Sequence, residues 1–116
     1  MPRAPKLEWF EELPCAVTVC DRRYRILYMN DRSAEVNKES GGKALIGKSL
    51  LDCHPAAAKK KLKEVMASDR PHLYTVERKG KKKLVFQGQW RKGGRLGGLV
   101  ELYMELPKDM ENHVRD

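Results

Sequence analysis

The chain has 116 residues, of which 41% are apolar and 34% are charged, and its net charge is +8. A chain of this length builds one modest core, which excludes a two-domain enzyme, and its apolar content excludes an intrinsically disordered protein. No apolar stretch approaches the roughly 20 residues that cross a bilayer, so we expect no membrane span. Residues 7–13 contain three glutamates where a secretory signal would be apolar.

The three cysteines, Cys15, Cys20 and Cys53, are an odd number without Cys-x-x-Cys spacing. This pattern indicates neither a disulfide framework nor a zinc site, and it is typical of a reducing compartment. We therefore expect a cytoplasmic protein whose cysteines behave as small buried apolar side chains.

The positive charge is concentrated in residues 59–63 and 78–83. Two interpretations stay open: a surface that docks an acidic partner or nucleic acid, or a solvated helix face followed by a basic hairpin turn. Nucleic-acid-binding modules pair such charge with a recognition helix or with stacking aromatic side chains, and neither is recognisable here. The solvated surface is the favoured interpretation, and we expect no nucleic-acid partner.

Residues 6–13 place Leu7, Phe10 and Leu13 on one helical face, and Pro14 ends that pattern. We predict a short amphipathic N-terminal helix. On so small a domain, its apolar face covers the outer side of a sheet or a second subunit.

Residues 15–20 and 24–29 are rich in β-branched and apolar residues and predict a hairpin. Asn30 follows at once and is a suitable N-cap for a helix over residues 31–37. Two glycines at 41 and 42 end this helix.

Short helical segments are predicted for residues 44–46 and 48–53, and Pro55 has the position of a first-turn proline. The helix over residues 56–67 is the best formed of the chain. Its apolar stripe predicts that it packs inward.

Residues 72–78, 83–91 and 96–106 show the alternation of β-strands. We expect the following residues to form the inward or apolar phase of these strands: Tyr74, Val76, Leu84, Phe86, Gly88, Trp90, Leu96, Gly98, Val100, Leu102, Met104 and Leu106. In the last strand Glu101, Tyr103 and Glu105 lie on the opposite side.

This order, with helices inserted between a first hairpin and a three-stranded meander, resembles the PAS sensory domain. Residues 13–21 and 25–30 look like the opening hairpin of that family, with Asp21 before the turn and Asn30 closing the second strand. Residues 46–50 are similar to its Ile-Gly-Lys segment, and residues 97–101 resemble its closing strand. The resemblance covers residues 13–106.

The resemblance implies an α+β fold: a five-stranded antiparallel sheet with short helices covering one face, preceded here by the N-terminal amphipathic helix. It divides the chain into an N-terminal helical cap or dimerisation segment (1–13), a PAS domain (14–106) and a C-terminal tail or linker (107–116). It also implies a sensor for signal transduction, in transcription regulation or a two-component system, that acts as a homodimer with a downstream output domain or protein.

The resemblance also implies a central cavity that closes over a small ligand. The candidate lining residues are Val17, Val19, Ile26, Tyr28, Leu50, Leu62, Val65, Met66, Tyr74, Val76, Phe86, Val100 and Leu102. Tyr28, Tyr74 and Gln87 are the polar groups best suited to orient a ligand. The same apolar residues can equally form an ordinary filled core, and this alternative stays open.

His54 lies in the turn before the long helix, a region from which some haem-binding PAS domains present their proximal histidine. The resemblance therefore makes His54 a candidate metal ligand if haem binds, against the alternative of a helix-start or surface residue. Flavin-binding relatives carry a reactive cysteine shortly after the glycine that corresponds to Gly47. Cys53 falls about three residues late, so we do not expect flavin adduct chemistry.

No paired nucleophile and base and no phosphate-binding loop are recognisable. We therefore expect a sensor that binds a small ligand or a partner protein and relays a conformational change, and not an enzyme. The alternative is a ligand-free interaction module whose basic surface docks an acidic partner or nucleic acid.

Overall fold

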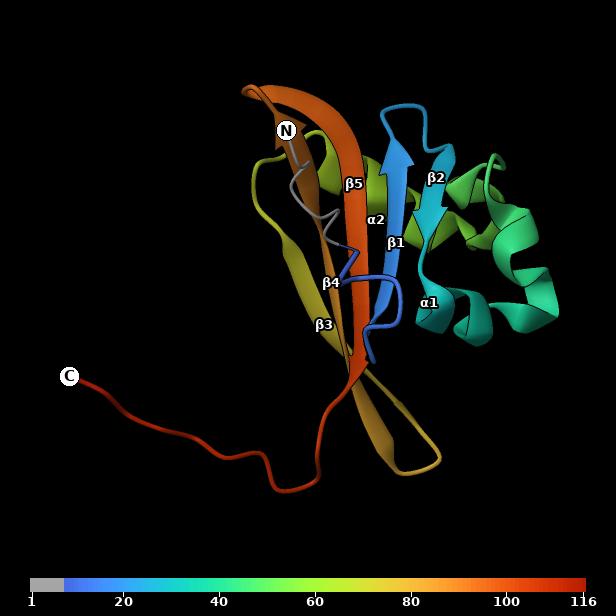
Figure 1. The fold of residues 1–116 in the computed structure, drawn as a ribbon. Coiled ribbons are helices and arrows are strands. Elements are labelled where there is room, and N and C mark those ends of the chain that lie inside the picture. The colour runs from blue at the N-terminus through green and yellow to red at the C-terminus, as the bar shows by residue number, and fades with distance from the viewer. Residues whose placement is uncertain (1–7) are drawn as a thin grey trace, which may run out of the picture.

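The computed structural model describes residues 8–116, except the side chain of Cys53. Five strands form one antiparallel sheet in the order β2-β1-β5-β4-β3, and the helical segments lie between β2 and β3 in the chain (Figure 1). The elements are β1 (Ala16–Asp21), β2 (Ile26–Met29), α1 (Asp31–Val36), η1 (Lys38–Ser40), η2 (Gly42–Leu45), η3 (Leu50–Cys53), α2 (Ala56–Met66), β3 (His72–Arg78), β4 (Lys81–Lys92) and β5 (Arg95–Glu105). The predicted α+β fold is confirmed.

The first and last strands lie side by side at the centre of the sheet. Val19 pairs with Val100, and the same register carries Thr18 opposite Glu101. The turns on either side of β4 are tight because Lys79–Gly80 and Gly93–Gly94 all have positive φ, as two-residue type I′ hairpins require.

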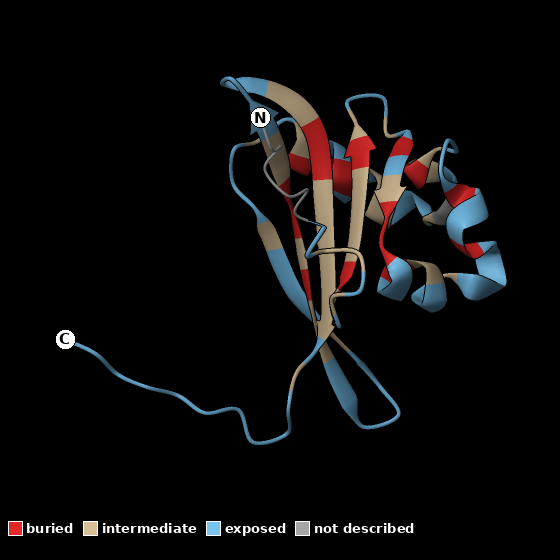
Figure 2. Ribbon diagram, viewed as in Figure 1, coloured by how far each residue is buried: buried red, intermediate tan, exposed pale blue. Residues whose placement is uncertain are grey.

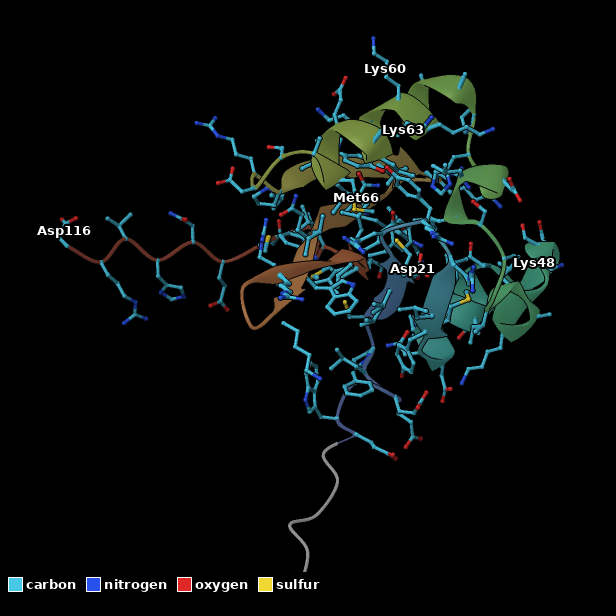
Figure 3. All side chains as sticks on the ribbon, turned by 90° about the horizontal axis from the view of Figure 1, so that it is seen from above. Asp21, Lys48, Lys60, Lys63, Met66 and Asp116 are labelled. Atoms are coloured by element: carbon cyan, nitrogen blue, oxygen red, sulfur yellow. The ribbon has the colours of Figure 1, made fainter. Side chains whose placement is uncertain are left out.

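The helices cover one face of the sheet, which we call the inner face, and the N-terminal segment crosses the opposite, outer face (Figure 1). Seen from above, the sheet separates the two, with Lys60 pointing away from the sheet (Figure 3). The buried residues are spread over the sheet and the helical segments (Figure 2), and the apolar core lies between the inner face and these segments. Its residues are Cys20, Ile26, Met29, Leu45, Leu50, Leu62, Val65 and Leu99.

Asn30 joins the two sides of the molecule. Its side chain is fully buried, and Oδ1 accepts from the backbone N–H of Val17 and of Ser33, both at 2.9 Å. Nδ2 donates to the carbonyl oxygens of Phe10 and Cys15, both at 2.8 Å. The predicted N-cap is confirmed, and the same amide also holds the N-terminal segment and β1.

The helix predicted for residues 6–13 is wrong in its described part, which forms two successive turns; its first two residues lie outside the described residues. The carbonyl oxygen of Phe10 accepts from the Asn30 side chain, and that of Glu11 accepts from the Asp31 N–H at 3.0 Å. These bonds to the core take the place of the carbonyl bonds that would continue a helix.

The inward assignment of the apolar residues in β4 is also wrong. Gln89 donates to the carbonyl oxygens of Val65 and Met66 in α2, at 3.5 and 2.8 Å, so the odd-numbered residues of β4 face the helices. An apolar set of alternate residues shows only that some other part of the chain covers that face of the sheet. Here the N-terminal segment covers part of the outer face, so apolar residues occur on both faces. The residues on that outer face are therefore Leu84, Phe86, Gly88 and Trp90.

At the end of the sheet near the β4–β5 turn, β5 lies unusually close to β1. A Cβ on Gly98 would lie 1.9 Å from the carbonyl oxygen of Cys20. The Trp90 ring covers Gly97 and donates from Nε1 to that same oxygen at 2.9 Å. Only glycine fits this crossing.

Cys15 and Cys20 are free thiols, and Cys20 is buried in the core. Burial raises the pKa of the Cys20 thiol, so it stays protonated and unreactive near neutral pH. The side chain of Cys53, expected to be buried, lies outside the described residues. Within residues 8–116, no helix is long and apolar enough to cross a membrane.

Candidate functional site

A cavity of about 400 Å³ lies between the inner face and the first helical segments. Its floor comes from strands β1, β5, β4 and β3, and its roof comes from α1 and η1, with His54 at one side. The exposed side chains of Val36 and Tyr74 lie at its opening. The lining residues are Ala16, Thr18, Ser33, Val36, Asn37, Ser40, His54, Tyr74, Val76, Arg78, Val85, Glu101 and Tyr103.

A row of polar side chains crosses the inner face over four strands. Thr18, Glu101, Gln87 and His72 stand opposite one another in successive strands. Gln87 is buried and donates from Nε2 to Oε2 of Glu101 at 2.9 Å. The Gln87 Oε1 accepts from Nδ1 of His72 at 3.2 Å, which assigns the proton to Nδ1. We call these four residues the polar row.

Beside the polar row, Ala16, Tyr103, Val85 and Tyr74 stand opposite one another in the same strand order. The Tyr74 ring stacks on the His72 ring with centroids 4.7 Å apart. Burial, and then the nearby Glu101 and Tyr103, raise the pKa of Tyr74. Its hydroxyl therefore stays protonated and can donate a hydrogen bond toward the cavity.

The roof of the cavity is held to its floor by one short contact. The hydroxyl oxygens of Thr18 in β1 and Ser33 in α1 lie 2.6 Å apart. Asn37 then donates from Nδ2 to the Ser33 carbonyl at 2.9 Å. Hydroxyl and amide groups thus face the cavity from both sides.

His54 lines the cavity and is half-buried. Its Nδ1 donates to the carbonyl oxygen of Leu50 at 2.7 Å, because a carbonyl can only accept. This bond leaves Nε2 unprotonated when the ring is neutral, which is the form that binds a metal ion.

Haem binding requires more than the unprotonated Nε2 of His54. It requires a flat apolar pocket around the macrocycle, whereas the floor in front of His54 carries Glu101 and the Thr18–Ser33 hydroxyl pair. The residues present therefore do not fit haem. Among the described side chains, no three His, Cys, Asp or Glu residues lie together as a metal centre would require.

The structure separates the nine predicted site residues into three groups. His54 and Tyr74 line the cavity. Leu50, Leu62 and Met66 belong to or pack against the core, as the alternative of ordinary core packing expected. The other four lie on the outer face: Tyr28, Phe86, Val100 and Leu102.

The outer face carries a second, larger groove of about 720 Å³ between the sheet and the N-terminal segment. Apolar side chains from three strands line it, including Val17, Val100 and Met104. Trp9 lies at this groove and remains 68% exposed. The outer face thus offers a continuous apolar surface that the N-terminal segment covers only in part.

The rim of this groove is polar. Tyr28 donates its hydroxyl to Oε1 of Glu11 at 2.9 Å, and the Lys43 ammonium lies 3.4 Å from the same oxygen. Burial and then the bond to Glu11 raise the pKa of Tyr28 to about 12. The phenol is therefore neutral at physiological pH and fastens the N-terminal segment to β2.

The sequence patterns missed most of the polar cavity residues. Glu101 and Tyr103 were correctly separated from the apolar phase of β5, but that separation did not say which phase faces the helices. Gln87 was expected to orient a ligand. Its bonds to Glu101 and His72 show that the three side chains share one face, and the bonds of Gln89 to α2 identify that face as the inner one.

The sequence matches the family model described as the PAS fold over residues 10–87. Among solved structures, a C-terminal domain from Streptococcus mutans is 24% identical, with a TM-score of 0.62 over 82% of this chain and 78% of that chain. The PAS domain of Bordetella pertussis BvgS is 17% identical, with a TM-score of 0.64 over 86% and 82% of the two chains.

The Vibrio cholerae VqmA in complex with ligand and DNA is 17% identical, with a TM-score of 0.68 over 90% of this chain. This chain spans about half of VqmA, 53% of its length. None of the curated proteins matches the sequence. At these identities the structural likeness shows the fold.

Proposed function

Because this chain belongs to the PAS family, we propose that it is a sensor that binds a small molecule in the inner cavity and relays a conformational change to a partner. PAS domains are sensory and signalling modules. The proposal is supported by VqmA, a neighbour in fold whose structure is described as a complex with a ligand and DNA. It assigns no enzymatic activity to this chain.

The observation that carries the proposal is a polar floor beneath a cavity. Protein interiors are usually filled, and buried polar groups are usually bonded within the protein. Here Glu101 and Tyr74 face a space of about 400 Å³, which lies within the range of small-molecule sites. A bound molecule would fill this space and satisfy these groups.

The roof supplies the part that moves. It consists of a six-residue helix followed by two 3₁₀ segments, η1 and η2, and short segments of this kind have low local stability. A ligand that binds between Ser33 and Glu101 would change the roof position. Since Asn30 caps α1 and also bonds the N-terminal segment, the displacement would reach the outer face.

We propose that the outer face binds a second copy of the chain. Its apolar groove of about 720 Å³ and the exposed Trp9 are the kind of surface that forms dimers. A structure of VqmA is described as a dimer. Leu102→Glu should give a monomer in sedimentation velocity, whereas Lys60→Glu, at an exposed position of α2 that points away from the sheet (Figure 3), should leave the dimer intact. A dimer unchanged by Leu102→Glu would contradict this interface.

The output belongs to the proposal as well. The fold is shared with sensor histidine kinases and with the DNA-binding VqmA, so we propose a cytoplasmic role in a two-component or transcriptional pathway. Residues 107–116 contain no helix or strand and extend away from the sheet (Figure 1). We propose that they act as the linker to an output domain or protein.

Two neighbouring substitutions on β3 test ligand binding. Val76→Trp should fill the cavity, because Val76 lines it, and bound mass in a native mass spectrum of the purified protein should disappear. Thr75→Trp, which points to the outer side of the same strand, should retain that mass. If the wild type carries no bound mass and no small molecule shifts cavity resonances, the ligand-free interaction module with a basic docking surface replaces the sensor.

A visible absorption spectrum of the same samples checks the assignment of His54. Because the polar floor does not fit haem, we expect no Soret band. A Soret band that disappears in His54→Ala would restore His54 as a metal ligand and contradict the fit described above.

A further inference from the structure

We infer that the inner cavity selects a small organic cation, whose N–H groups bind the Glu101 carboxylate and whose body lies against Tyr74 and Tyr103. This inference rests on the proposed ligand-binding function. It follows from the chemistry of the cavity floor, from the absence of an ion pair to Glu101 among the described residues and from the size of the space.

Glu101 is a half-buried carboxylate with one oxygen in use. Its Oε2 accepts from Gln87, and its Oε1 has no hydrogen bond among the described residues. No lysine, arginine or histidine in the described part of the chain forms an ion pair with it. A carboxylate withdrawn from water favours a cation as its partner.

The polar row holds Glu101 in place. His72 donates to Gln87, and Gln87 in turn donates to Glu101, so the buried amide has both ends occupied and cannot turn to accept from a ligand. The acceptor presented to the cavity is therefore the remaining oxygen of Glu101. A donor-bearing ligand is complementary to it, and an anion would be repelled.

The basic side chains around the cavity form no ion pair with Glu101 in the described part of the chain. Arg78 lies six residues along β3 from His72, so about 20 Å of strand separates the backbones of these two residues at about 3.3 Å per residue. Lys83, on the inner face of β4, directs its ammonium to the Tyr103 ring. The free oxygen of Glu101 therefore remains open to a cation from outside.

The walls next to Glu101 suit the body of such a ligand. Tyr74 and Tyr103 line the cavity in the row beside it, and the faces of aromatic rings attract cations. The Lys83 ammonium already lies over the Tyr103 ring, 5.1 Å from its centroid, so a ligand cation would meet the Tyr74 ring and Tyr103 would contact the apolar part of the ligand. A space of about 400 Å³ is at the small end of ligand sites, which limits the ligand to a small amine or protonated heterocycle.

The test titrates the full chain with two pairs of compounds that differ in the ammonium group, followed by the amide resonances of the cavity residues. The pairs are tyramine with 4-ethylphenol and n-butylamine with 1-butanol, at concentrations up to about 10 mM, the weak end for ligands of this size. We expect each amine to bind at least about tenfold tighter than its neutral counterpart.

Glu101→Gln keeps the shape of the side chain and should abolish this preference. Glu105→Gln makes the same change of charge at an exposed position of β5 and should retain it. Equal binding within both pairs, or a preference that survives Glu101→Gln, overturns the inference while ligand binding stands. If none of the four compounds binds, the inference is overturned, and the native mass spectrum then decides separately whether the proposed sensor function also fails.

Discussion

The two faces of the sheet are built from alternate residues of the same strands and yet differ in chemistry. On β5, Glu101 and Tyr103 face the cavity, while Val100 and Leu102 face the outer groove. The inner cavity is small and has a polar floor, whereas the outer groove is larger and apolar. One face is thus suited to select a small molecule by hydrogen bonds and charge, and the other to bury area against a chain.

The difference also shows where the stability of the domain resides. The buried core occupies only the part of the inner face beneath α2 and η3, around Leu62 and Leu99, and the remainder of that face is the cavity floor. The outer face contributes fully to apolar burial only when something covers it. Substitutions on the two faces should therefore have different consequences.

The largest loss of stability is expected at Gly98, where β5 lies so close to β1 that no side chain fits between them. Gly98→Ala would place a Cβ 1.9 Å from the Cys20 carbonyl oxygen, so the central strands must separate. We expect a loss of at least about 4 kcal/mol in the free energy of unfolding, measured by urea denaturation. Gly94→Ala, where nothing lies within 4 Å, should cost only about 1 kcal/mol from its positive φ.

The second effect concerns the residue that connects the faces. Asn30→Ala removes four hydrogen bonds and leaves the N–H groups of Val17 and Ser33 without their acceptor. We expect a loss of about 3 kcal/mol in the same measurement. Asn30→Asp keeps the acceptor, so its free energy of unfolding should fall between those of the wild type and Asn30→Ala. An unchanged stability of Asn30→Ala would contradict the role of Asn30 in connecting the two faces.

The third prediction compares two neighbours on β5. Leu99 is buried in the inner core, and Leu99→Ala should cost about 3 kcal/mol at every protein concentration. Val100→Ala on the half-covered outer face should cost about 1 kcal/mol in dilute samples and more as the concentration rises, because dimer formation adds to stability. A Val100→Ala cost that does not change with concentration would contradict the proposed use of the outer face.

The smallest effect is at the polar rim of the outer groove. The pKa of Tyr28 is raised from 10.0 to about 12 in the folded state, so between these values the folded chain keeps a proton that the unfolded chain loses. Its stabilisation is therefore complete below pH 10 and is lost as the pH rises through about 12.

Tyr28→Phe should cost about 1 kcal/mol or less at pH 8. The difference from the wild type should shrink above pH 10, as measured by urea denaturation at each pH. Glu11→Gln keeps an acceptor for the phenol and should lose less than Tyr28→Phe. A difference that stays constant up to pH 12 would show that the phenol proton does not contribute.

Most of the fold could be predicted because local chemistry marks it. The order of strands along the chain and the Asn30 cap follow from periodicity and backbone preferences, and both are confirmed. The helix after Asn30 ends at Val36, before the two glycines that were predicted to end it, and Gly42 begins η2. The N-terminal helix could not be predicted correctly, since its carbonyl groups are captured by Asn30 and Asp31, which are distant in sequence.

The cavity was harder to predict for a different reason. The alternation of side chains places Glu101 and Val100 on opposite faces of the sheet but does not show which of the two faces the helices cover. That assignment depends on contacts between strands and helices. The register of His72 with Gln87, and of Gln87 with Glu101, places the three on one face, and the bonds of Gln89 to α2 show that the helices cover this face. The cavity-facing residues are thus defined by contacts between strands, and no single segment of the sequence contains this information.

The hairpin between β3 and β4 has a consequence for assembly. Strand β3 is an edge strand with unpaired backbone groups, and such an edge can extend into the sheet of another molecule. Here the hairpin carries four exposed basic residues: Arg78 at the end of β3, Lys79 in the turn, and Lys81 and Lys82 at the start of β4. Two copies that approach through this hairpin would bring like charges together, so the basic residues oppose aggregation through the β3 edge.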